Sequence, residues 1–328
     1  MTDTGKSTDP KILIHASDPA PMLARLKKRH PSLQATGCST YQNLPDKLQS
    51  FAPEIYYGIR FAGSAGFPRG ALLGEFAPKW ISVGGSGVDH LQDWDPKQIQ
   101  VTNSAGVAAS MMAEFILGGF LHFSLDIAGL QRDRGTATWQ GGRQMVPLSG
   151  KTLLIVGLGQ TGGAIAERAK AFGMHTIGTR ARPRPTPHID EVFSADQLRE
   201  LWPRADFIAV CVPLLASTRG LIDAAAFNQM RDGVVLADVS RGGVIESAAL
   251  VASLESGKLG GAVLDVFETE PLPSAHKLWQ TPNTLVSPHC SSVFEGWEMA
   301  SFDMFCDNVE RYLADEPLRN LVDPKLGY

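Results

Sequence analysis

The 328-residue chain has few cysteines, little net charge and no long uninterrupted apolar run. Its four cysteines are scattered, which excludes a disulfide framework or a zinc knuckle and is typical of reduced thiols in a cytoplasmic protein. A formal net charge of −4 excludes general attraction to nucleic acid or to an anionic membrane. The first ten residues, MTDTGKSTDP, lack the apolar core of a signal peptide, and no stretch reaches the length of a membrane span. We therefore expect a cytoplasmic protein without a nucleic-acid partner, a membrane partner or a metal site.

Hydrophobic residues make up 44% of the chain, enough for two modest cores. Short apolar runs alternate with amphipathic stretches, a pattern typical of an α/β chain with parallel sheets. The predicted strands cover residues 11–15, 54–59, 79–83, 100–102, 152–156, 175–178, 207–212, 234–239, 261–266 and 284–287. The predicted helices cover residues 22–29, 44–51, 108–127 and about 297–313, and a loop rich in glycine and arginine covers 133–149.

A glycine cluster, GLGQTGG at residues 157–163, follows the apolar run LLIV and fits the pattern G-x-G-x-x-G. In this pattern Gly157 permits a tight turn, Gly159 lets a pyrophosphate approach the backbone, and Gly162 lets the helix pack close to the strand. The N–H groups at the start of the following helix then attract the phosphates. A purely structural turn or an S-adenosylmethionine enzyme also has such a cluster, so the motif predicts a nucleotide site without naming the nucleotide.

Three later apolar strands end in polar residues that suit one reaction. LADVSRGGVIE carries Arg241, GAVLDVFETEPLP carries Glu270, and NTLVSPHCSS carries His289. Each residue alone is an ordinary surface group, but the carboxyl ends of parallel strands meet at one edge of a sheet. An arginine fork holds a carboxylate and its adjacent carbonyl oxygen, a histidine protonates the developing alkoxide, and a carboxylate keeps that histidine oriented and charged. Together they predict hydride transfer from a nicotinamide cofactor to a 2-oxo acid.

These segments, in this order, resemble the D-isomer-specific 2-hydroxyacid dehydrogenase family over nearly the whole chain, including its glyoxylate and hydroxypyruvate reductases. The resemblance implies that Arg241 is the substrate clamp, His289 the acid/base and Glu270 its partner. It also implies that Gly87 and Val88, in ISVGGSGVDHL, donate backbone N–H groups to the substrate carboxylate. A homodimer through residues 108–127 and 133–149 is implied as well, although a buried interdomain helix would explain the apolar surface there equally.

The resemblance further implies a set of residues that contact the cofactor, with Asp265 holding the nicotinamide carboxamide and VCVPLLASTRGLI walling the adenosine side. These residues are Gly157, Gly159, Gln160, Thr161, Gly162, Thr179, Arg180, Arg182, Val212, Pro213, Thr218, Val239, Ser240, Asp265 and Ser291.

Two departures from the family pattern lie beside the predicted catalytic residues. Cys290-Ser291-Ser292 replaces the usual small-residue turn with glycine after His289, and Asp238 stands where a neutral amide is common. The expected fold is α/β with two Rossmann-like domains, doubly wound parallel sheets and a cleft between them. The substrate domain would comprise residues 1–102 and 292–328, and the dinucleotide-binding domain residues 103–291.

A third departure concerns the cofactor. At the end of the second strand of the glycine-cluster unit, where an NAD enzyme has an acid for the ribose hydroxyls, this chain reads TRARPR from Thr179. An arginine there attracts a 2′-phosphate that an acid would repel. Arg180 and Arg182 therefore predict NADP as the cofactor, with NAD bound more weakly, unless this is only an exposed basic loop.

We expect an enzyme that reduces a small 2-oxo acid, similar to glyoxylate or hydroxypyruvate, to the D-2-hydroxy acid with NADPH. Arg60, at a strand end of the substrate domain, is an additional candidate for binding the substrate, or else a surface arginine. The alternatives are an NAD(P)-sensing scaffold similar to a corepressor, a dehydrogenase of the same family for another 2-hydroxy acid, and a methyltransferase.

Overall fold

The computed structural model describes residues 9–59, 66–324 and 326–327. The chain divides into two units, one made of Met1–Val107 with Glu295–Tyr328 and the other of Ala108–Phe294. The sequence predicted the two points where the chain passes between the units a little earlier, after residue 102 and before residue 292. Both units are α/β with entirely parallel sheets, as predicted.

Unit 1 has a five-stranded sheet in the order β2-β1-β3-β4-β5, the doubly wound order of flavodoxin-like folds. Its strands are β1 (Ile12–His15), β2 (Ala35–Cys38), β3 (Ile55–Gly58), β4 (Trp80–Val83) and β5 (Gln100–Asn103). Its helices are α1 (Ala20–Arg29), α2 (Leu44–Phe51), α3 (Arg69–Leu72), the short η1 (Asp89–Leu91) and α10 (Trp297–Leu313).

Strand β1 shows why the sheet of unit 1 is covered on both faces. All four of its residues are buried, as expected for a central parallel strand. Ile12 and Ile14 belong to the hydrophobic cluster that includes residues of α1 and α10, whereas Leu13 belongs to the cluster that includes residues of α2. Alternate side chains therefore serve two separate cores, and the C-terminal helix completes one of them.

Unit 2 has a seven-stranded sheet in the order β12-β11-β10-β9-β6-β7-β8. Read from β6, this is the Rossmann order with one further strand, and the order reverses between β6 and β9. The strands are β6 (Thr152–Val156), β7 (His175–Arg180), β8 (Glu191–Ser194), β9 (Phe207–Val210), β10 (Val234–Asp238), β11 (Leu259–Leu264) and β12 (Thr284–Val286). The helices are α4 (Ala109–Ser124), α5 (Ile127–Gly135), α6 (Gln160–Ala171), α7 (Leu198–Leu201), α8 (Ala224–Gln229) and α9 (Ser247–Glu255), with short η2 (Ala195–Gln197), η3 (Trp202–Arg204) and η4 (Lys277–Trp279).

The seven-stranded sheet is also covered on both faces. Leu153 and Ile155 of β6 pack in the cluster that contains residues of α4 and α6. Leu154 and Val156 pack in the cluster that contains residues of α7, α8 and α9. With both faces covered, the edge formed by the carboxyl ends of the strands is left for a ligand.

The predicted helix over residues 108–127 is present as α4, although it ends three residues earlier than predicted and a second helix, α5, follows it. α4 ends at Ser124, and Asp126, in a left-handed conformation with φ of 46°, starts α5 by accepting a hydrogen bond from the Gly129 amide at 3.0 Å. Its carboxylate satisfies an N–H group that the new helix would otherwise leave unpaired. The prediction also missed β2 and β8, two edge strands whose residues are mostly half-buried.

Within the described ranges, no single helix has both the length and the apolar composition to cross a membrane. Only α4 with α5, bent by 58° at their junction, meet those criteria jointly.

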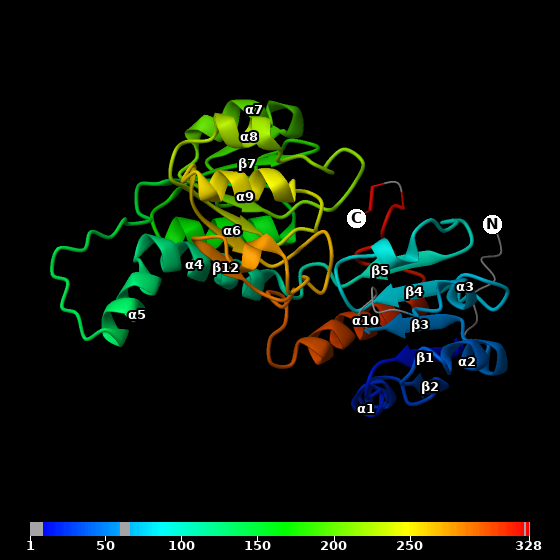
Figure 1. Ribbon diagram of the computed structural model, residues 1–328. Coiled ribbons are helices and arrows are strands. Elements are labelled where there is room, and N and C mark those ends of the chain that lie inside the picture. Colours follow the sequence, from blue (N-terminus) through cyan, green and yellow to red (C-terminus); the bar gives the residue numbers. More distant parts are fainter. Residues whose placement is uncertain (1–8, 60–65, 325, 328) are drawn as a thin grey trace. The chain divides into compact units, whose positions relative to one another are not determined.

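Helix α5 and residues 136–149 form an arm that extends away from the sheet of unit 2 (Figure 1). Arg143 ties the arm together through ion pairs with Asp126 and with Asp133, the latter at 2.6 Å. Trp139 on this arm is 97% exposed, and Met145 and Val146 are nearly half exposed. The arm therefore presents apolar side chains to solvent on a locally braced support.

Candidate active site

The glycine turn after β6 has the shape that a pyrophosphate needs. Gly157 has a φ of 107°, and a Cβ there would lie 2.9 Å from the Cys211 carbonyl oxygen. A Cβ on Gly162 would lie 2.2 Å from the Gly157 carbonyl oxygen, so the helix packs onto the turn only because it has glycine there. A Cβ on Gly159 would meet nothing within 4 Å, which leaves the space into which a phosphate would fit.

The start of α6 adds hydrogen-bond donors to this turn. Gln160, Thr161 and Gly162 are its first residues, so their N–H groups have no carbonyl partner within the helix. Gln160 is exposed and Thr161 is half-buried, with its hydroxyl 3.8 Å from the Met112 sulfur. The N-terminal end of a helix with open space before it is a site for an anion.

The end of β7 places Arg180 beside the glycine turn. Thr179 pairs with Val156 in the sheet, and its carbonyl oxygen accepts hydrogen bonds from the amides of Gly157 and Leu158 at 3.2 and 2.9 Å. Arg180 follows directly and donates to the Thr186 hydroxyl at 3.4 Å. Arg182 is exposed in the loop beyond. Thr179 is only 2% exposed, and it holds the glycine turn through its backbone carbonyl.

The loop after β9 lies across the switch point from the glycine turn. Thr218 shapes it by donating its hydroxyl to the Pro213 carbonyl at 2.6 Å and accepting from the Leu215 amide at 2.8 Å. Val212 and Pro213 are half-buried and start this loop. Its position is the one expected for a wall of the nucleotide site, because β9 pairs directly with β6.

Arg241 follows β10 in a tightly bonded turn. The Asp238 carboxylate accepts hydrogen bonds from the amide and hydroxyl of Ser240 at 2.9 and 2.5 Å. Arg241 donates from Nη1 to the Ser240 carbonyl at 2.7 Å. Val239 and Ser240 are themselves buried, so they reach a ligand only through backbone atoms or after a local change.

His289 and Glu270 form the pair predicted from their order in the sequence. The Nδ1 atom of His289 lies 2.7 Å from a Glu270 carboxylate oxygen, and both side chains are about one-third exposed. The second Glu270 oxygen accepts from the Phe267 amide at 2.9 Å. Burial of the Glu270 carboxylate raises its pKa, but the bonds from His289 and Phe267 and the charges of His289 and Arg241 outweigh it, so the pKa is lowered. Glu270 therefore stays ionised at neutral pH, close to His289 and Arg241.

Asp265 fixes the loop that carries His289. Its carboxylate accepts hydrogen bonds from the Ser287 hydroxyl at 2.6 Å, the Cys290 amide at 2.8 Å, and the amide and hydroxyl of Ser291. The Asp265 side chain is 1% exposed. Its visible role is thus to anchor residues 287–291, with His289 held at a φ of 52° between them. Contact of Asp265 with a nicotinamide carboxamide remains a prediction.

Gly242 joins the turn of Arg241 to the loop of Glu270. A Cβ on Gly242 would lie 1.9 Å from the Phe267 carbonyl oxygen and 2.5 Å from the Glu268 nitrogen. Only glycine therefore lets these two backbone segments touch. The sequence pattern singled out Arg241 and Glu270 but gave no signal for this contact or for the anchoring role of Asp265.

The predicted substrate loop lies in unit 1, after β4. Within the described part of the chain, the amides of Gly87 and Val88 donate no backbone hydrogen bond, while the Ser86 carbonyl accepts from the Asn103 side chain at 2.8 Å. Two adjacent unpaired amides on a braced loop suit a carboxylate. Arg60, the other predicted substrate contact, lies outside the described residues. Among the residues that the structure does describe, no three His, Cys, Asp or Glu side chains are grouped to hold a metal.

Comparison with known proteins agrees with this geometry. Residues 117–291, more than half of the chain, match the family model described as D-isomer specific 2-hydroxyacid dehydrogenase, NAD binding domain. The chain belongs to the D-isomer-specific 2-hydroxyacid dehydrogenase family. The resemblance predicted from the sequence is thereby confirmed.

Individual relatives of this dehydrogenase family member are similar over much of the chain. Human D-3-phosphoglycerate dehydrogenase is 37% identical over 214 residues, 64% of this chain and 40% of that protein. Hydroxypyruvate reductase of Thermotoga maritima is 35% identical over 219 residues, 64% of this chain and 70% of that protein. A D-isomer specific 2-hydroxyacid dehydrogenase from Xanthobacter autotrophicus, crystallised with NADPH and MES, has a TM-score of 0.80 at 26% identity and covers 98% of this chain and 100% of that one. The first curated relatives are matched over about 40% to 59% of their own length.

Replacing Glu270 tests the pair that it forms with His289. Glu270→Gln keeps the shape of the side chain but removes the negative charge beside the His289 ring. We expect the alkaline limb of the kcat/KM–pH profile for 2-oxo acid reduction to move to lower pH, with kcat/KM at pH 8 reduced roughly 10²-fold. Steady-state kinetics from pH 5 to pH 9 measure this, with the exposed Glu255→Gln as the matched control. A profile in Glu270→Gln that overlays the wild type would remove Glu270 from the pair.

Replacing Asp238 tests how the turn of Arg241 responds to pH. Burial raises the pKa of Asp238 to about 7, partly offset by its bonds from Ser240. The folded chain therefore keeps a proton between about pH 4 and pH 7 that the unfolded chain has lost, so the free energy of unfolding falls as the pH rises through this window. Asp238→Asn removes this fall, on the order of a few kcal/mol.

Denaturant unfolding at pH 5 and at pH 8 checks this expectation. The difference in free energy of unfolding between the variant and the wild type should be larger, in favour of the variant, at pH 8 than at pH 5. Stability curves that run parallel at both pH values would contradict the raised pKa.

Proposed function

We propose that this chain reduces a small 2-oxo acid to the D-2-hydroxy acid with NADPH. The observation that carries the proposal is the His289–Glu270 pair, 2.7 Å apart and close to the charge of Arg241, at the ends of three neighbouring strands. An NAD(P)-sensing scaffold would need the glycine turn but not a charge-paired histidine beside an arginine. A methyltransferase would have no use for that pair.

The chemistry divides among the residues as follows. The cofactor, when bound, supplies the hydride. Nδ1 of His289 faces Glu270, so Nε2 is the atom left to give a proton to the substrate carbonyl oxygen. Arg241 holds the substrate carboxylate and polarises the carbonyl through its planar fork. The amides of Gly87 and Val88 hold the carboxylate oxygens, and Arg60 is kept as a further candidate contact.

Glyoxylate and hydroxypyruvate are the substrates we propose. A hydroxypyruvate reductase of Thermotoga maritima is among the relatives, which supports a small 2-oxo acid. The similarity to D-3-phosphoglycerate dehydrogenase makes another acid of the same class the main alternative. The four cysteines are free thiols, which supports the cytoplasm as the location in this proposal.

NADPH is proposed as the cofactor because of where Arg180 lies. The register of β6 and β7 puts it one residue beyond Thr179, beside the glycine turn, where a 2′-phosphate would be bound. Arg182, exposed in the same loop, adds a second positive charge. The Xanthobacter structure, crystallised with NADPH, supports this assignment. NAD would bind more weakly, because no acid at this position accepts hydrogen bonds from its ribose hydroxyls.

A homodimer through the arm is also proposed. Trp139, Met145 and Val146 expose more apolar surface than a braced segment without a partner would retain. A second copy of the chain would cover it through the same surface on both subunits.

The proposed activity is tested by oxidation of NADPH with a panel of 2-oxo acids. Glyoxylate or hydroxypyruvate should be reduced fastest, and Arg241→Ala should lower kcat/KM about 10²–10⁴-fold, because it removes a clamp that acts on the transition state. The exposed Arg199→Ala serves as the control and should keep wild-type turnover. Lack of reduction of every acid in the panel, with NADPH and NADH bound normally, would favour the sensor.

The cofactor preference is tested by Arg180→Ala. Loss of one charge-assisted contact of about 1.5–3 kcal/mol should lower kcat/KM for NADPH at least about tenfold. The value for NADH should change little, which makes it the internal control. A wild type that prefers NADH, or a variant with unchanged NADPH kinetics, would contradict the binding of a 2′-phosphate by these arginines.

The dimer is tested by placing charge on the arm. Light scattering at micromolar concentration should give the mass of two chains for the wild type and of one chain for Trp139→Lys with Val146→Lys, because two buried lysines would lose their hydration. Trp279→Lys, about half exposed and outside the arm, should remain dimeric. A wild type with the mass of one chain ends this proposal.

A further inference from the structure

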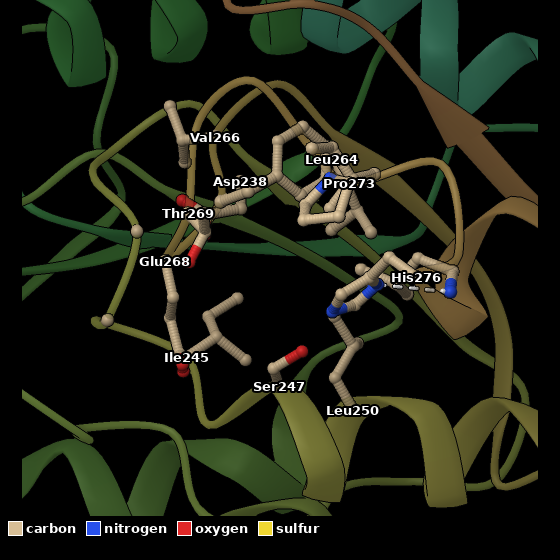
Figure 2. Close-up of a pocket in the computed structure, with 15 residues that line it drawn as sticks. Asp238, Ile245, Ser247, Leu250, Leu264, Val266, Glu268, Thr269, Pro273 and His276 are labelled. Atoms are coloured by element: carbon tan, nitrogen blue, oxygen red, sulfur yellow. Dashed lines mark hydrogen bonds between the residues drawn. The ribbon is translucent and has the colours of Figure 1, made fainter. Parts of the chain in front are cut away.

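Unit 2 contains a cavity between the N-terminal end of α9 and the loop that follows β11. Its volume is about 110 Å³. Figure 2 shows Ile245, Ser247 and Leu250 on the α9 side and Val266, Thr269 and Pro273 on the loop side. We call it the α9 cavity. None of the residues predicted to bind the cofactor or the substrate lines it.

The walls of the α9 cavity are mainly apolar. The branched side chains that line it are Ile245, Leu250, Leu264, Val266, Leu272 and Leu278. Since a cavity of about 150 Å³ in another protein holds benzene, this one accepts a ligand of about five non-hydrogen atoms. Such walls bind a branched aliphatic body and exclude a larger ring.

The polar lining of the α9 cavity is acidic. Asp238 lines it with a carboxylate that is 3% exposed, and the amide and hydroxyl of Ser240 both donate to its Oδ1 oxygen. Its Oδ2 oxygen accepts no hydrogen bond within the described part of the chain. Glu268 supplies a second carboxylate. The Nδ1 atom of His276 accepts a hydrogen bond from the Leu278 amide at 3.3 Å. A positively charged donor therefore complements this lining.

Three ionisable groups lie near Asp238, in addition to Glu268 and His276 of the cavity lining. Besides burial, the charge of Asp265 raises the pKa of Asp238, whereas the charge of Arg241 in the same turn lowers it. The charge of Asp238 in turn helps to raise the pKa of the Cys211 thiol after β9. None of the lining residues is a lysine or an arginine. A bound ammonium group would therefore stabilise the buried carboxylate of Asp238 through its open oxygen.

The α9 cavity borders both loops that carry the predicted catalytic residues. Gly242 and Gly243, directly after Arg241, line it from one side, and Phe267, Glu268 and Thr269, directly before Glu270, from the other. The backbones of Gly242 and Phe267 are in close contact, because a Cβ on Gly242 would lie 1.9 Å from the Phe267 carbonyl oxygen. A ligand that presses on one segment displaces the other.

We propose that the α9 cavity binds a small primary ammonium compound with a branched aliphatic body, and that its occupancy alters the placement of Arg241 and Glu270. The ammonium group bonds to Asp238, and the aliphatic body packs between Leu250 and Leu272. Binding itself is independent of the proposed reductase function; only its effect on turnover rests on that function.

Isobutylamine, with five non-hydrogen atoms, is the probe. Titration into the full chain without substrate or cofactor, followed by ligand-observed NMR, should give a dissociation constant on the order of 1 mM. Isobutanol has the same shape without the charge and should bind at least tenfold more weakly. Isobutyrate, an anion of similar shape, should not bind measurably. Amine affinity should rise as Asp238 ionises between pH 6 and pH 8.

Two variants locate the binding. Asp238→Asn keeps the shape of the cavity and should weaken amine binding at least tenfold and remove its pH dependence. Leu272→Phe, at a half-buried position, fills the cavity and should also weaken binding at least tenfold. The matched control Leu313→Phe, at an exposed position in unit 1, should bind as the wild type does. Equal affinity for amine and alcohol, or full affinity in Leu272→Phe, would overturn the proposal.

A second readout tests the link to catalysis. Saturating isobutylamine should change kcat/KM of the wild type at least twofold relative to Leu272→Phe at the same amine concentration, a comparison that cancels condensation of the amine with free 2-oxo acid. Binding without any change in relative turnover would contradict the coupling through Gly242. A chain that binds the amine but reduces no 2-oxo acid would instead contradict the proposed function.

Discussion

The site depends on the buried carboxylate of Asp265. Four donors from three residues of the segment 287–291 converge on its two oxygens, and the strand bond between the Asp265 amide and the Asp238 carbonyl ties it to β10. Burial of a carboxylate is costly unless its oxygens are hydrogen-bonded, so these bonds favour the observed arrangement of the loop. That arrangement holds His289 in a left-handed conformation that its own backbone would not favour.

From this anchor the remaining contacts follow in order along the sheet. His289 after β12 meets Glu270 after β11, and Glu270 lies within the influence of Arg241 after β10. Gly242 closes the series, because its missing side chain lets the turn of β10 rest on the loop of β11. Three chemically useful side chains are thus placed by backbone segments that brace one another. Such bracing limits the motion of His289 and Arg241.

Much of this arrangement was predictable from the sequence, and the reasons are local. Central parallel strands are short, continuous apolar runs, so β6 and β10 are easy to recognise in the sequence. The polar residues that follow each strand are then easy to identify as well. The edge strands β2 and β8 escaped because half-buried segments such as ATGC and EVFS carry no such signal. The break between α4 and α5 was also missed, although Asp126 is the type of residue that starts a helix.

Other features could not be predicted because they depend on distant contacts. The raised pKa of Asp238 comes from burial among three strands, and the anchoring role of Asp265 requires the path of residues 287–291. The close approach of Gly242 to Phe267 joins residues on different strands. In each case the residue type is visible in the sequence, but only the folded structure shows which neighbour determines its role.

The central claim is that His289 is the proton donor and no part of the nucleotide site. His289→Asn tests it most directly, because the variant keeps a polar side chain of similar reach to Nδ1 but cannot act as an acid near neutral pH. NADPH binding, measured by cofactor fluorescence, should stay within about twofold of the wild type, while kcat for 2-oxo acid reduction should fall roughly 10²–10⁴-fold. Near-normal turnover in this variant, or loss of turnover only in proportion to lost NADPH binding, would contradict the assignment of His289.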